Sequence, residues 1–337
     1  MNEQRETGIA ELFAKATQGS LPFEAMTHVL EALVGAGNLP VGHHFYQTWA
    51  SNLRGRIKVA KDAYARAQPL WQKLHAQYPE IDPLPQPVDW LRFNLNGRTI
   101  DYRDIDDPYF MEIIDRVHKH TITMLEGVEP PWEMYKAIEY VVRHKIPGDL
   151  VECGVWNGGS VLLMALALMH FGDTSRKIYL YDTFEGMPQP EDVDRNWDGV
   201  PALPTWEEKK RKEPDAPNWG FGGTVAMVQE VVYASGYPKE NFVFVKGMVE
   251  DTLPAHKPEQ ISLLRLDTDF YSSTYHELVT LYPVLVPGGV LIIDDYGYFQ
   301  GARLATDKYL EETAAPLFLS RVTQSVRLAI KPAGQLG

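Results

Sequence analysis

Cysteine and long apolar runs are the scarcest features of this sequence. A single cysteine, Cys153, among 337 residues excludes an internal disulfide and a cysteine-rich zinc site. The longest apolar run, residues 161–171, is about half of the ~20 residues that a membrane-spanning helix requires. The first residues hold no basic segment followed by an apolar stretch, so they predict no secretory signal. We therefore expect a cytoplasmic protein without a membrane partner.

Positive charge is also scarce. The chain has 32 Lys and Arg residues against 45 Asp and Glu residues, which gives a formal net charge of −13. The densest basic cluster, residues 209–212, is flanked on both sides by Glu and Asp. Such a surface repels phosphate backbones, so we expect no nucleic-acid partner. The hydrophobic fraction of 45% is ordinary for a globular protein and is ample for a buried core.

Two parts of the chain differ in their periodicity. Residues 8–16, 22–35 and 39–53 place apolar side chains at helical spacing, and a Pro-rich segment at 79–87 follows them. We predict a helical N-terminal extension over residues 1–88, which we interpret as a cap or a dimerisation arm, and a second domain over residues 89–337. The expected assembly is a homodimer.

The second domain alternates short apolar strands with helices. Asn96-Gly97 indicates a hairpin between residues 91–95 and 98–102, and residues 107–144 are predicted to be helical. Beyond them we predict strands at 150–153, 177–182, 242–245, 261–267 and 290–294, and helices at 160–171, 224–236, 273–285 and 302–312. This alternation predicts an α/β fold with a mostly parallel sheet and helices on both faces. Residues 188–223 lack periodicity, and we interpret them as a lid or an insertion near an active site.

The turn after the first strand of this sheet is rich in glycine. It runs from Glu152 to Ser160 with glycines at 154, 158 and 159, but Trp156 replaces the middle glycine of a dinucleotide motif. A helix that begins at such a turn favours a phosphate or a carboxylate, and Glu152 suits a ligand ammonium. Asp182, at the end of the next strand, suits ribose hydroxyls. Together they favour a nucleoside with an amino-acid tail, although a structural turn and a turn-capping Asp remain the alternatives.

Four carboxylates end two further strands. Asp267 and Asp269 follow one strand, and Asp294 and Asp295 follow another. At neighbouring strand ends they would repel one another strongly unless a cation lay between them. Carboxylate oxygens suit Mg²⁺, with Mn²⁺ or Ca²⁺ as alternatives, and one of the four acids could serve as a general base. Solvated strand ends that cap the following helices are the other interpretation.

The order of these motifs resembles the macrocin O-methyltransferase family. The resemblance extends from about residue 109 to 310, and it rests on residues 148–156, 181–188, 246–254, 264–274 and 292–296. It implies a class I, Rossmann-like methyltransferase that uses S-adenosylmethionine and Mg²⁺ to methylate a hydroxyl of a small-molecule acceptor. The expected acceptor is a sugar of a glycosylated natural product or a polysaccharide precursor.

The resemblance also assigns roles to individual residues. It implies a metal at Asp267, Asp294 and Asp295, with Asp269 as the base. The implied cofactor contacts are Thr121, Met124, Glu152, Gly154, Val155, Trp156, Ser160, Asp182, Thr183, Gly247, Met248, Val249 and Asp267. Among these, Met248 and Val249 would flank the adenine, and residues 121–124 would close over it.

Other functions remain open at this stage. A metal-binding Asp-x-Asp is also typical of nucleotide-sugar glycosyltransferases, although that function leaves Asp182 and the glycine turn unexplained. A non-catalytic binding protein with a methyltransferase-like domain is the second alternative. The sequence departs from the family at two places. Thr268 stands where the family's sugar enzymes often carry Gly, and the N-terminal extension has no counterpart in the short members. Both departures leave the identity of the acceptor undetermined. Trp197, Trp206, Trp219 and Phe221 in the predicted lid would either stack on an acceptor or pack the lid shut.

Overall fold

A computed structural model describes most of the chain. The described residues are 23–35, 37, 39, 60–79, 92–95, 98–101, 104–121, 127–212, 223–314 and 317–333. They form two compact units, Met1–Asp107 and Pro108–Gly337.

The first unit contains two described helices and a hairpin. Helices α2 (Phe23–Gly35) and α4 (Ala60–Gln77) bury Leu30 and Leu74, and Arg66 forms a two-pronged ion pair with Glu31 at 2.7 and 2.8 Å. Strands β1 (Arg92–Leu95) and β2 (Arg98–Asp101) pair antiparallel, as the Asn-Gly signal predicted. The predicted helix at 8–16, nearly all of that at 39–53, and the Pro-rich segment from residue 80 lie outside the described residues. The predicted domain boundary at residue 88 therefore stays a prediction.

The second unit is built on a seven-stranded sheet in the order β5-β4-β3-β6-β7-β9-β8. Its strands are β3 (Asp149–Cys153), β4 (Ile178–Asp182), β5 (Phe242–Lys246), β6 (Ile261–Leu266), β7 (Leu285–Ile293), β8 (Ser320–Arg321) and β9 (Arg327–Ile330). Strands β3 to β7 are parallel, while β9 pairs antiparallel with both β7 and β8. The central strand β6 is buried along its whole length, as expected for an apolar strand covered on both faces. The predicted mostly parallel α/β sheet is confirmed.

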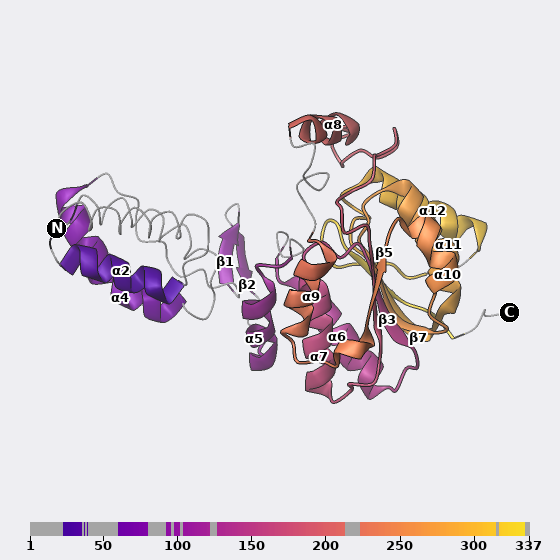
Figure 1. Cartoon of the computed structure of the whole chain (residues 1–337), viewed down its shortest axis with the longest axis horizontal. Coiled ribbons are helices and arrows are strands. Elements are labelled where there is room, and N and C mark those ends of the chain that lie inside the picture. Colours follow the sequence, from indigo (N-terminus) through magenta and orange to yellow (C-terminus); the bar gives the residue numbers. More distant parts are fainter. Residues whose placement is uncertain are drawn as a thin grey trace. The chain divides into compact units, whose positions relative to one another are not determined.

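Helices cover both faces of this sheet. Helices α6, α7 and α9 lie on one side and α10, α11 and α12 on the other (Figure 1). Their bounds are α5 (Pro108–Val117), α6 (Glu129–Arg143), α7 (Gly159–Phe171), α8 (Leu203–Lys212), α9 (Val225–Tyr233), α10 (Val249–His256), α11 (Tyr271–Leu281) and α12 (Gln300–Glu312). Helix α7 is apolar almost all round, because it packs against α5, α6 and α9 as well as the sheet. No helix in the described part of the chain has the length and apolar content needed to span a bilayer.

The structure adds detail that the sequence predictions lacked at three places in this unit. The single helical stretch at 107–144 is two helices, α5 and α6, with Gly127 at a φ of 126° between them and two prolines in the first turn of α6. Residues 188–223, predicted to lack regular structure, contain α8, whose charged sequence shows little apolar periodicity because Trp206 is its main buried side chain. Strands β8 and β9 were missed because they are only two and four residues long, and β8 is exposed.

Candidate active site

The carboxyl ends of the parallel strands open onto one cavity of about 450 Å³. Residues that follow β3, β4 and β5 form one part of its wall: Gly154, Trp156, Asp182, Thr183, Gly247, Met248 and Val249. The segments after β6 and β7 contribute Asp267, Thr268, Asp269, Asp294, Asp295, Tyr298 and Phe299. This is the place where open α/β sheets bind ligands. Most of the predicted site residues lie on the wall of this cavity.

The glycine turn after β3 is held by Asp182. One carboxylate oxygen of Asp182 accepts hydrogen bonds from the backbone N–H groups of Val155 (2.7 Å) and Trp156 (3.1 Å). The other accepts from the N–H of Phe184 at 2.6 Å. Gly154 has a φ of 82°, and a Cβ there would collide with the backbone carbonyl of Asp267. Asp182 thus shapes the turn while it also faces the cavity, so the turn-forming interpretation and the predicted ligand contact are compatible.

Some predicted cofactor contacts do not lie on the cavity wall. Val155 and Ser160 are buried at the start of α7, and Thr121 lies beside that start, where the N–H of Gly159 donates to the carbonyl of His120 at 2.9 Å. Met124 lies outside the described residues. The roles predicted for these four residues therefore stay predictions.

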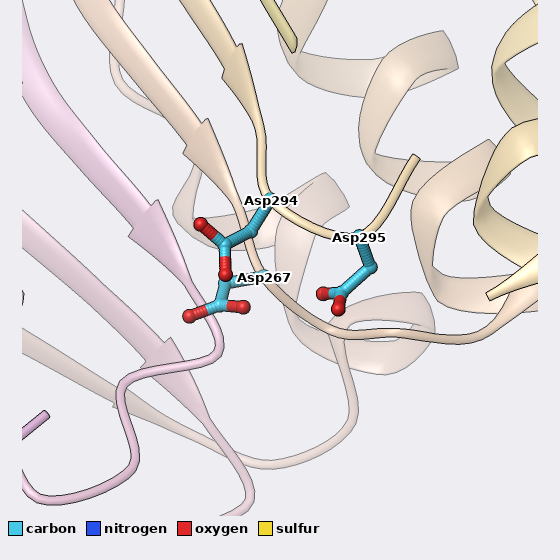
Figure 2. A group of neighbouring side chains, drawn as sticks. All are labelled: Asp267, Asp294 and Asp295. Atoms are coloured by element: carbon cyan, nitrogen blue, oxygen red, sulfur yellow. The ribbon is translucent and has the colours of Figure 1, made fainter. Parts of the chain in front are cut away.

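Three aspartates converge at the other part of the cavity. Asp267 at the end of β6, and Asp294 and Asp295 at the end of β7, each offer one oxygen, and these oxygens lie within 4.8 Å of one another (Figure 2). We call these residues the acidic trio. The Oδ2 atom of Asp295 is buried without a hydrogen-bond partner among the described residues. An orphaned carboxylate oxygen beside two further carboxylates fits a divalent cation with oxygen ligands.

Asp269 lies beside the acidic trio in a strained conformation. Its φ of 66° places a non-glycine residue in the left-handed region, where strain often marks a functional residue. Burial raises the pKa of Asp269 to about 7, although a hydrogen bond with Asp295 opposes the rise. Burial also raises the pKa of Asp267 and of Asp295 well above the usual range, and the nearby carboxylates add to the rise. The cluster is thus poised to exchange a proton or to bind a cation.

A buried arginine joins the two parts of the site. Arg265, 2% exposed, contacts Glu152 Oε1 at 2.6 Å, Asp267 Oδ2 at 2.5 Å and Asp294 Oδ1 at 2.8 Å. Burial alone would lower the pKa of Arg265 because it disfavours the charged form, but the three carboxylates raise this pKa well above the usual value. Sequence analysis missed this residue. The available signal was a charged side chain within an otherwise apolar strand, because a charge in a doubly covered strand needs a partner.

Glu152 lies beneath the cavity rather than on its wall. Its side chain is 1% exposed and is directed to Arg265, which is its directly opposed partner across β3 and β6. Its Oε2 has no hydrogen-bond partner among the described residues. Burial raises the pKa of Glu152 to about 7, and the neighbouring Arg265 limits the rise. The predicted contact between Glu152 and a ligand ammonium stays a prediction.

Thr268, the residue that departs from the family pattern, has a partner of its own. Its hydroxyl lies 3.0 and 3.1 Å from the two carboxyl oxygens of Glu277 on α11. Glu277 is completely buried, and burial raises its pKa well above the usual value. Sequence analysis assigned no role to Glu277. The hydrogen bond between Thr268 and Glu277 holds the loop from Asp267 to Asp269 against helix α11.

Comparisons with known proteins agree with this geometry. A family model described as Macrocin-O-methyltransferase (TylF) matches residues 119–325. The 8-demethyl-8-(2,3-dimethoxy-alpha-L-rhamnosyl)-tetracenomycin-C 4'-O-methyltransferase of Streptomyces olivaceus is 35% identical over 181 residues, which cover 52% of this chain and 62% of that protein. The Mycinamicin III 3''-O-methyltransferase of Micromonospora griseorubida is 33% identical over 159 residues, which cover 47% and 59%. The chain thus spans less than two thirds of the length of these relatives.

A solved structure shows the same architecture. The O-methyltransferase NovP is 26% identical to this chain, with a TM-score of 0.52, and the match covers 64% of this chain and 83% of that one. The likeness confirms the predicted class I methyltransferase fold.

Proposed function

Because the chain belongs to the macrocin O-methyltransferase family, we propose that it is an S-adenosylmethionine-dependent O-methyltransferase that also requires a divalent metal. The proposed acceptor is a small molecule whose sugar carries the reacting hydroxyl, either in a glycosylated natural product or in a polysaccharide precursor. The observation that supports this most is that one cavity joins the glycine turn and Asp182 to the acidic trio. The names of the two similar enzymes, both O-methyltransferases of glycosylated compounds, support the acceptor class.

Different residues of the cavity wall would have different roles in such a reaction. The glycine turn, Asp182 and the segment Gly247–Val249 would hold the methyl donor, which would supply the methyl group on its sulfonium sulfur. The acidic trio would hold a divalent cation, which would supply Lewis-acid stabilisation of negative charge on the acceptor oxygen. Asp269 accepts the proton of the acceptor hydroxyl. The cavity wall would align the acceptor hydroxyl with the methyl group to be transferred, and such alignment would provide much of the acceleration.

Metal removal tests this proposal directly. We expect the protein to transfer labelled methyl groups from S-adenosylmethionine to members of a glycoside panel. We expect EDTA to abolish the transfer because it removes the Lewis acid that would stabilise negative charge on the acceptor oxygen. Excess Mg²⁺ or Mn²⁺ should restore it. Transfer that EDTA does not change would contradict the metal requirement.

Calorimetry separates the proposal from its two alternatives. We expect the protein to bind S-adenosylmethionine and not UDP-sugars. The opposite preference would favour a metal-dependent nucleotide-sugar glycosyltransferase. Binding of S-adenosylmethionine without transfer to any acceptor on the panel would favour a non-catalytic, methyltransferase-like binding protein.

We also propose that the protein works as a homodimer in the cytoplasm and that residues 1–88 contribute to its assembly. Helices α2 and α4 show that part of this segment forms packed helices. Light scattering of the full chain should give about twice the 38.2 kDa mass of one chain. A single-chain mass would contradict the dimer.

A further inference from the structure

Two exposed aromatic side chains lie together where the cavity meets the surface. Trp197 is 45% exposed and Tyr298 is 38% exposed, and their ring centroids are 5.4 Å apart. Tyr298 lines the cavity that also contains the aspartates. The aromatic surface is therefore continuous with the proposed reaction centre.

The position of Tyr298 identifies the part of a ligand that it would meet. The cofactor wall follows β3, β4 and β5, whereas Tyr298 and Phe299 come after β7 and Val326 precedes β9. The acidic trio follows β6 and β7, so it lies between the cofactor wall on one side and Tyr298 and Val326 on the other. An acceptor whose hydroxyl reaches the aspartates from the side away from the cofactor would extend past Tyr298.

The loop that carries Trp197 is firmly attached. Asp194 is 1% exposed, and its carboxylate accepts hydrogen bonds from the backbone N–H groups of Tyr271 (2.9 Å) and Glu191 (2.7 Å). Next to it, Asn196 forms a β-bridge with Phe299, and the N–H of Gln300 donates to the carbonyl of Arg195 at 2.7 Å. The loop is thus fixed to the starts of α11 and α12, which reduces the entropy lost when a ligand binds.

The two tryptophans of the described lid residues differ in exposure. Trp206 is 7% exposed and its indole N–H donates to the carbonyl of Met187 at 3.1 Å, so it packs the lid. The indole N–H of Trp197 donates to the exposed Asp198 at 2.6 Å, which satisfies its polar edge while much of the ring stays open to solvent. Trp219 and Phe221 lie outside the described residues. Trp197 is therefore the lid residue whose exposure suits stacking.

We propose that Trp197 and Tyr298 form an acceptor subsite that binds the apolar, flat aglycone of a glycoside while its sugar reaches the aspartates. This inference rests on the proposed function and narrows its acceptor to glycosides with an aromatic aglycone. Rings on such a surface gain from stacking and from the burial of apolar area. A sugar that carries only a methyl group in place of the aglycone gains neither.

The test compares an aryl glycoside with the methyl glycoside of the same sugar. In the Trp197→Ala protein we expect KM for the aryl glycoside to rise about two- to twelvefold, as loss of a stacked pair worth roughly 0.5–1.5 kcal/mol predicts. We expect kcat, the affinity for S-adenosylmethionine and KM for the methyl glycoside to stay at the wild-type values. Phe318→Ala removes an aromatic ring that is 87% exposed and is not on the cavity wall, so it serves as the matched control.

Two outcomes distinguish this inference from the proposed function. If the wild-type protein methylates glycosides but Trp197→Ala keeps the ratio of the two KM values, the subsite is overturned and the function stands. If calorimetry shows that the wild-type protein binds the aryl glycoside more tightly than Trp197→Ala does and yet transfers no methyl group, the subsite is supported and the function fails. Equal affinity of both proteins for the aryl glycoside also overturns the subsite.

Discussion

Replacing Asp269 with Asn should reduce the rate of methyl transfer by about 10²–10⁴-fold, the usual contribution of a general base. The amide has the same shape but cannot accept the proton of the acceptor hydroxyl. Asn tolerates the left-handed conformation of this position as well as Asp does, so the loop should keep its φ of 66°. Single-turnover kinetics with labelled methyl donor would measure the loss.

Cofactor binding separates this role from a structural one. Calorimetry should give nearly the same affinity for S-adenosylmethionine in Asp269→Asn as in the wild-type protein. Asp192→Asn, a change of the same kind at an exposed aspartate in the lid, should leave both the rate and the affinity unchanged. Equal losses of turnover and cofactor binding in Asp269→Asn would show that Asp269 supports the cavity rather than the proton transfer.

Replacing Arg265 with Met should have the largest effect on stability. The change removes the guanidinium that contacts Glu152, Asp267 and Asp294 and leaves these carboxylates without their buried partner. Breaking a buried ion pair from one side typically costs about 3–5 kcal/mol of unfolding free energy. Urea denaturation followed by circular dichroism would measure the difference. Arg303→Met, which removes an exposed pair with Asp307, should cost less than about 1 kcal/mol.

The pH dependence of this loss has a definite sign. Burial already raises the pKa of Glu152 to about 7 from an ordinary value of 4.5 while Arg265 is present, so removal of the arginine raises it further. A carboxyl group whose pKa is raised on folding holds more protons in the folded state, and its contribution to stability therefore declines as the pH rises. Below about pH 7 Glu152 holds its proton in both folded proteins, so its part of the deficit of Arg265→Met should be small and level, and it should grow as the pH rises above about 7. A deficit that is constant with pH would argue against the ionic origin.

The location of the site followed from the sequence because the carboxyl ends of parallel strands share one edge of a sheet. Acidic residues directly after two apolar strands, such as Asp267 and Asp294, had to lie at that edge once the parallel alternation was recognised. The order of the strands was not available in the same way. Glu152 and Arg265 are directly opposed only because β6 inserts between β3 and β7, and nothing local in either strand indicates this pairing. Glu152 was therefore predicted to face a ligand, while its side chain contacts Arg265.

Helix α8 and the contact between Thr268 and Glu277 were equally hidden from the sequence. Helix α8 exposes most of its charged side chains, so its apolar spacing was too weak to predict it. The partnership of Thr268 with Glu277 depends on how α11 packs behind the loop after β6. Local periodicity predicts which segments are buried, but it does not specify which buried polar groups meet.

The burial of Cys153 gives the molecule a built-in reporter. Its thiol is completely buried at the end of strand β3, and burial raises its pKa well above the usual value, with Glu277 nearby adding to the rise. A thiol in this setting reacts with an alkylating reagent only when the sheet opens. Because the chain has no other cysteine, the rate of alkylation measures the opening of β3, which pairs with the strand that Asp267 follows, without any engineered label.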